Sequence, residues 1–94
     1  MEVLKKDSDC MYVHLGKDVV INANNILGIF NLEFIQNTSE YRIMYESMLK
    51  NDKIIDISDD CKKTFILFKE KKEIKAYISN ISATTIAKRK NFLY

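Results

Sequence analysis

Few side chains of this sequence have the type and spacing that catalysis requires. His14 is the single histidine, and no adjacent serine or cysteine is available for it to activate. A surface or interface position therefore explains His14 better than a role as a general base. Gly16 and Gly28 stand apart, whereas a phosphate-binding loop needs several closely spaced glycines. We expect no enzyme, no catalytic residue, no cofactor and no small-molecule substrate.

Cysteine and aspartate residues give no recognisable metal-binding spacing either. Cys10 and Cys61 lie far apart and, with a single histidine, cannot complete a zinc site. Asp56, Asp59 and Asp60 could form an acidic metal site, but their spacing matches no calcium loop and an aspartate-rich turn explains them. We therefore expect no metal, two free thiols and a cytoplasmic protein, because reduced cysteines are typical of that compartment.

Charge is distributed unevenly along the chain. The formal net charge is only +2, but residues 1–60 carry 6 basic and 11 acidic side chains, whereas residues 61–94 carry 9 basic and 2 acidic ones. Such a division indicates a polyanionic partner or a head-to-tail contact between copies of the chain. Lysine-rich loops that keep the surface soluble are the simpler explanation, and charge alone does not separate the possibilities.

Two short basic clusters are the candidate contacts with nucleic acid. Lys62 and Lys63 follow the aspartate-rich turn. Lys88 and Arg89 lie near the end of the sequence and precede Lys90. Lysine and arginine attract phosphates without reading the base sequence. The alternatives are an exposed turn for the first cluster and, for the second, a favourable contact with the negative end of a helix dipole.

The length and composition are those of one small folded domain. The chain has 94 residues, 47% of them hydrophobic, with no proline and two glycines, so no linker divides it. The apolar run Phe65–Phe68 is far too short to cross a membrane, and the first ten residues lack the apolar stretch of a signal peptide. We expect an N-terminal extension over residues 1–10, a single domain over residues 11–94, and no membrane contact.

Hydrophobic periodicity predicts six strands. They are expected near residues 11–15, 19–21, 26–30, 54–57, 65–68 and 74–78. Phe65–Phe68 is apolar at every position, so this strand should be covered on both faces. Gly28 inside the third strand indicates a bulge or a close backbone approach. The short connections between the first three strands favour a meander.

Apolar residues at helical spacing predict two helices, over about Thr38–Lys50 and Ser82–Lys90. Asn37 is the expected N-cap of the first helix, with Glu40 completing a capping box. Ser82 is the expected cap of the second. The order β-β-β-α-β-β-β-α indicates the α+β class, with a small, mostly antiparallel sheet and a helix packed on it.

Three segments combine strands, turns and polar residues in a recognisable order. They are MYVHLGKDVVINANNILGIFN at residues 11–31, IDIS at residues 55–58, and ISNISATTIAKRK at residues 78–90. In these segments the chain resembles the small bacterial regulators of extracellular-matrix genes called RemA and RemB, and the RemB branch most closely. The resemblance extends over residues 11 to 90.

This resemblance implies a function. RemA-like proteins are DNA-binding transcription regulators that form ring-shaped homo-oligomers, with a fold similar to the LytTR-type DNA-binding domain. The resemblance therefore implies a regulator that binds duplex DNA as a ring-like homo-oligomer. The alternative, from a different functional class, is a structural or adaptor oligomer that binds protein partners and no DNA.

The resemblance also marks residues for a DNA surface. Relatives have an arginine pair at the turn that matches Cys61–Lys62, and another arginine where this chain has Asn25. Lys88–Arg89 matches a basic pair near the end of the family's C-terminal helix. The bidentate hydrogen bonding of arginine is therefore absent both from the Cys61–Lys62 turn and from Asn25. A positive charge remains only at the turn, on Lys62. With Lys63, the expected DNA-binding set is Lys62, Lys63, Lys88 and Arg89.

Overall fold

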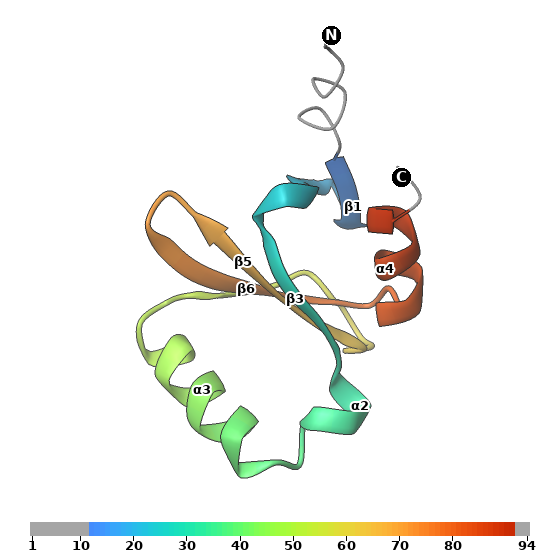
Figure 1. The fold of residues 1–94 in the computed structure, drawn as a ribbon. Coiled ribbons are helices and arrows are strands. Elements are labelled where there is room, and N and C mark those ends of the chain that lie inside the picture. Colours follow the sequence, from blue (N-terminus) through green and yellow to red (C-terminus); the bar gives the residue numbers. More distant parts are fainter. Residues whose placement is uncertain (1–11, 92–94) are drawn as a thin grey trace, which may run out of the picture.

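The computed structural model describes residues 12–91, which fold into two β-sheets and flanking helices (Figure 1). The strands are β1 (Tyr12–Gly16), β2 (Val19–Asn22), β3 (Ile26–Asn31), β4 (Ile54–Asp56), β5 (Thr64–Glu70) and β6 (Glu73–Ser79). The helices are the 3-10 turn η1 (Ala23–Asn25), α2 (Leu32–Ile35), α3 (Ser39–Lys50) and α4 (Ala83–Asn91). The class is α+β, as the sequence predicts. The expected extension over residues 1–10 lies outside the described residues.

Strand β5 lies inside the larger sheet and explains how the molecule is layered. Phe65 and Ile66 are both fully buried, although successive side chains of a strand point to opposite faces. Phe65 packs in an apolar cluster with residues of α2 and α3, and Ile66 packs in a second cluster with residues of β1, β2 and α4. The four-stranded sheet is therefore the middle of three layers (Figure 1). This confirms the prediction that the strand is covered on both faces.

The predicted meander of the first three strands is wrong. β1 pairs only with β2, whereas β3 joins the four-stranded sheet, whose order is β3-β5-β6-β4. Asn22 caps η1, and this tight turn separates β2 from β3. The buried side chains Val13 and Leu15 then lie against a face of the larger sheet, where removing their apolar surface from water stabilises the fold.

The larger sheet is mixed in direction. β5 runs antiparallel to β3 and to β6, but β4 runs parallel to β6. β4 can lie parallel to β6 because β5, which comes between them in the chain, runs in the opposite direction and returns the chain to the end of the sheet where β4 began. The register between β3 and β5 shifts between Ile26 and Gly28, which confirms the predicted irregularity at that glycine.

Two details of the helices differ from the sequence-based prediction. The N-cap of α3 is Thr38, whose hydroxyl accepts a hydrogen bond from the amide of Tyr41 at 3.2 Å, so the predicted cap Asn37 is wrong. The helix α2 was not predicted. It is only four residues long and begins where the Asn31 side chain accepts a hydrogen bond from the Glu33 amide at 2.9 Å. The expected order of elements therefore lacks α2 and η1.

Helix α4 matches its prediction. The Ser82 hydroxyl accepts a hydrogen bond from the amide of Thr85 at 3.1 Å, which confirms Ser82 as the cap. Ile86 is fully buried and anchors the helix to the layer that contains β1. Within residues 12–91, no helix has the length and apolarity needed to cross a membrane.

Candidate functional site

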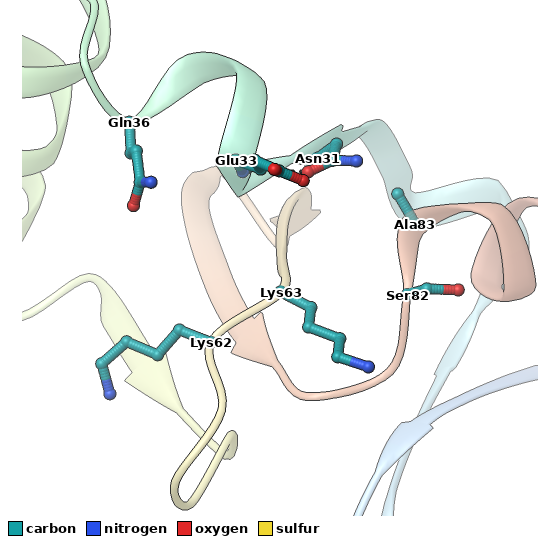
Figure 2. Close-up of a pocket in the computed structure, with 7 residues that line it drawn as sticks. All are labelled: Asn31, Glu33, Gln36, Lys62, Lys63, Ser82 and Ala83. Carbon is teal, nitrogen blue, oxygen red and sulfur yellow. Dashed lines mark hydrogen bonds between the residues drawn. The ribbon is translucent and has the colours of Figure 1, made fainter.

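A shallow pocket lies where the start of α2, the β4–β5 loop and the start of α4 meet (Figure 2). Its volume is about 320 Å³, and it is lined by Asn31, Glu33, Gln36, Lys62, Lys63, Ser82 and Ala83. The Lys63 side chain extends along the pocket toward Ser82, whereas the Lys62 side chain points in the opposite direction, away from Ser82 (Figure 2). The pocket joins one predicted basic cluster to the starts of two helices.

The backbone at Lys63 is held from two sides. Its amide donates to the carbonyl oxygen of Ser79 at 2.9 Å, and its own carbonyl oxygen accepts from the amide of Leu32 at 3.0 Å. The neighbouring Thr64 hydroxyl donates to the carbonyl oxygen of Ile81 at 2.6 Å. These bonds tie the β4–β5 loop to both α2 and the segment before α4. Lys63 therefore presents an exposed ammonium group from a fixed position, and it forms no ion pair with any residue that the structure describes.

Lys62 has a partner within the chain. Its ammonium nitrogen lies 2.8 Å from Asp56 Oδ2 and 3.4 Å from the Ser58 hydroxyl. The hydrogen bond and the charge of Asp56 raise the pKa of Lys62. A phosphate that approaches Lys62 must therefore compete with Asp56, which makes Lys62 a weaker candidate contact than Lys63.

Asp56 is the centre of this small network. Partial burial by itself raises the pKa of Asp56, but hydrogen bonds from Lys62 and from the Ser58 hydroxyl and amide outweigh burial and lower it to about 2. The amide and the hydroxyl of Ser58 lie 2.8 Å and 2.6 Å from Asp56 Oδ1. Asp59, in the same loop, lies 2.9 Å from the Lys17 ammonium. These two carboxylates thus fix the loop, and among residues 12–91 no three potential ligands gather as a metal site requires.

The second basic cluster lies at the other end of α4. The Arg89 guanidinium donates from Nη1 to the carbonyl oxygen of His14 at 2.7 Å, so it ties α4 to β1. Lys88 is exposed and forms no ion pair among the described residues. Lys88 follows Ala83 by five residues, which places it about 8 Å further along the helix axis. The four predicted residues therefore form two separate pairs. The side chain of Lys90 lies outside the described part of the chain.

His14 is exposed on the outer face of β1, as predicted for a surface residue. Its Nε2 lies 2.6 Å from the carbonyl oxygen of Lys17. A carbonyl oxygen only accepts, so Nε2 carries a proton and stabilises the turn between β1 and β2.

Asn25, which the resemblance matches to an arginine of the family, does not lie at the pocket. Asn25 ends η1, directly before β3, whereas Lys63 adjoins Thr64, which pairs with Asn31 at the far end of β3. That strand places about 20 Å between Asn25 and Lys63. Cys61, which stands at the other family arginine position, is exposed with a free thiol.

Sequence reasoning missed three fully buried hydroxyl residues that hold the site, namely Ser58, Thr64 and Ser79. The Ser79 hydroxyl donates to the carbonyl oxygen of Leu15 and accepts from the amide of Ile81 at 2.9 Å. Thr64 and Ser79 pair directly across β5 and β6. Serine and threonine are usually exposed, so their types alone gave no signal of these roles.

Comparison with protein-family models gives one match. The model described as extracellular matrix regulatory protein A-like, or RemA-like, matches residues 12–89. The match runs from the first residue of β1 into the last turn of α4 and includes all four predicted basic residues. A comparison with curated proteins found no match. Because the family model covers most of the sequence, this chain belongs to the RemA-like family of extracellular matrix regulatory proteins.

Proposed function

We propose that this chain is a homo-oligomeric, DNA-binding transcription regulator of extracellular-matrix genes, close to the RemB branch and LytTR-like in fold. It acts in the bacterial cytoplasm and has no enzymatic activity. Membership of the RemA-like family supports the regulatory role. The observation that carries the DNA-binding part is the exposed Lys63 ammonium. It is held at a fixed backbone position beside the start of α4 and has no carboxylate partner in the described structure.

The pocket around Lys63 suits a phosphate in two ways. Its ammonium supplies charge. Ser82 and Ala83, the cap and the first residue of α4, line the same pocket, and the positive end of a helix dipole favours anions. Glu33 lines the pocket as well and repels a phosphate. We therefore expect a modest affinity for each subunit.

Repetition of this patch makes a modest contact sufficient. Once one subunit of an oligomer has bound a duplex, the other subunits are held near the same duplex. Their binding then becomes intramolecular, so the whole oligomer binds more tightly than one subunit does. Lys88 supplies a second charge on the same subunit, at the far end of α4. Lys62 contributes only where a phosphate displaces it from Asp56.

Binding of a fluorescent duplex, followed by anisotropy at low salt, tests this function. We expect the wild-type chain to bind and Lys63→Gln to bind several-fold more weakly, since each lysine–phosphate contact adds to affinity. Lys50→Gln is the matched control, because Lys50 is an exposed lysine at the far end of α3 and lines no part of the pocket. Equal losses for the two variants, or no loss for Lys63→Gln, would contradict the proposed contact.

The competing function is an oligomeric adaptor that binds proteins and no DNA. Two of the four candidate residues favour it, because Lys62 is paired with Asp56 and Arg89 is bonded to the carbonyl oxygen of His14. The same anisotropy experiment separates the two functions. An assembled protein that binds no duplex at low salt supports the adaptor.

A further inference from the structure

The Lys63 pocket contains two opposite charges that are not bonded to each other. Glu33 and Lys63 both line it, yet neither forms an ion pair with any residue that the structure describes. A bare phosphate satisfies Lys63, but the Glu33 carboxylate repels it. The pocket therefore suits a ligand that carries both an anionic group for Lys63 and hydrogen-bond donors for Glu33.

Backbone hydrogen bonds hold both charged residues in place. The Lys63 carbonyl oxygen accepts from the amide of Leu32 at 3.0 Å, so the residue before Glu33 is bonded directly to Lys63. The Glu33 amide in turn donates to Asn31 Oδ1 at 2.9 Å. A ligand that bridges Glu33 and Lys63 therefore meets two backbone positions that are already fixed, which lowers the entropy lost on binding.

The neutral side chains of the pocket supply further polar groups. Asn31 uses its oxygen for the Glu33 amide, and its side-chain nitrogen, which only donates, lies on the side of Ala83 (Figure 2). Gln36 supplies a donor and an acceptor at the opposite side of the pocket (Figure 2). Among the described residues that line the pocket, only Ala83 is apolar. The ligand should therefore be polar along its whole length, which disfavours a nucleotide base or an apolar amino-acid side chain.

The volume of the pocket limits the size of this ligand. Its 320 Å³ lies near the lower end of the range of roughly 300–1,000 Å³ that is typical of small-molecule sites. A small ligand with an anionic group and several hydroxyl groups meets the requirements of charge, polarity and size together. Sugar phosphates are the common class of metabolite with this chemistry.

We propose that the Lys63 pocket binds a small sugar phosphate, which competes there with duplex DNA and so acts as an effector of the regulator. The phosphate accepts from the Lys63 ammonium and the Asn31 side-chain amide, and the sugar hydroxyls donate to the Glu33 carboxylate. A DNA backbone brings a phosphate to the same pocket but lacks the ribose 2′-hydroxyl that could donate to Glu33. Binding of the sugar phosphate is independent of the function proposed above, whereas the competition rests on it.

Titration calorimetry of the full chain with ribose 5-phosphate, ribose and inorganic phosphate tests the binding. We expect ribose 5-phosphate to bind about ten-fold more tightly than inorganic phosphate, because hydrogen bonds to a charged carboxylate contribute at least one factor of ten. Ribose alone should bind more weakly still, since it lacks the charge for Lys63. Equal affinities for ribose 5-phosphate and inorganic phosphate would show an adventitious ion only, and no binding of ribose 5-phosphate would overturn the proposal.

Glu33→Ala separates the role of the carboxylate from that of the lysine. It removes the acceptor for the sugar hydroxyls, so the preference for ribose 5-phosphate over inorganic phosphate should fall from about ten-fold towards equality. Lys63→Gln should instead weaken the binding of both compounds. Glu46→Ala is the matched control, because Glu46 is an exposed glutamate on α3 that does not line the pocket. Circular dichroism checks folding, and an unchanged preference in folded Glu33→Ala would refute the bridging ligand.

Anisotropy of a bound fluorescent duplex tests the competition. Ribose 5-phosphate should release the duplex at concentrations where inorganic phosphate of equal ionic strength does not, which separates competition from salt screening. Equal release by both compounds would overturn the competition. A protein that binds ribose 5-phosphate but keeps its duplex would also overturn it, and would leave the pocket as a sugar-phosphate site. A protein that binds ribose 5-phosphate and no duplex would refute DNA binding and the competition, but not the sugar-phosphate site.

Discussion

Replacing Asp56 by asparagine isolates one interaction of the candidate site. Asp56 Oδ1 accepts two hydrogen bonds from Ser58, and Oδ2 accepts one from Lys62 at 2.8 Å. Asparagine keeps an oxygen for Ser58 but puts an amide group, which only donates, in front of the Lys62 ammonium. The variant therefore removes the ion pair and leaves the Ser58 bonds in place.

The pKa of Asp56 gives the size of the effect. Its pKa falls from 3.8 to about 2, and a shift of this size corresponds to about 2.5 kcal/mol for a shielded group. The Ser58 hydrogen bonds supply part of this shift. The carboxylate is 41% exposed and its lysine partner 54% exposed, so solvent screening leaves at most about 1 kcal/mol for the ion pair. Because the folded pKa lies below the unfolded one, this stabilisation is complete above about pH 4 and is lost as the pH falls towards 2.

Urea unfolding at pH 7 and pH 2 measures this difference. At pH 7, Asp56→Asn should lower the free energy of unfolding by about 1 kcal/mol, and at pH 2 the two proteins should converge. Asp56→Ala should be less stable still, by about 1–3 kcal/mol, because the buried Ser58 hydroxyl and amide lose their acceptor. Equal stability of wild type and Asp56→Asn at pH 7, or a gap that persists unchanged at pH 2, would refute the role of the ion pair.

Three further predictions concern other parts of the chain. Glu33→Gln should raise affinity for duplex DNA up to about five-fold at low salt in anisotropy titrations, since a like charge leaves the Lys63 pocket; unchanged affinity would place DNA elsewhere. Ile86→Ala should lower the free energy of unfolding by about 2–5 kcal/mol in urea, because Ile86 is fully buried; a loss below 1 kcal/mol would show that α4 packs loosely. Deleting residues 1–10 should leave the Tm within a few degrees by calorimetry, and a large drop would show that they pack on the domain.

Local pattern predicted the strands well because burial leaves a regular signature. Val13 and Leu15 are buried where Tyr12 and His14 are exposed, which is the alternation visible in the sequence. The pairing of the strands had no such signature. β3 pairs with β5, more than thirty residues away, and nothing within β3 distinguishes that partner from β2.

The candidate site was predictable only in part. Lys63 was identified by its charge, but the hydrogen bonds that fix its backbone come from Ser79 and Leu32, which are distant in sequence. The Lys62–Asp56 ion pair spans six residues and depends on the shape of the loop between them. Asn37 and Thr38 are both good N-caps, so sequence alone could not choose between them.

The most direct test of the proposed function is the salt dependence of duplex binding by the assembled protein. We predict that affinity falls steeply as salt rises, and that Lys62→Ala with Lys63→Ala flattens the slope by about one unit per lost contact in each bound subunit. The single Lys63→Ala change should account for most of this, because Lys62 is held by Asp56. Sequence preference should change little, since phosphate contacts do not read bases. An assembled protein with no affinity for any duplex at low salt would contradict DNA binding outright.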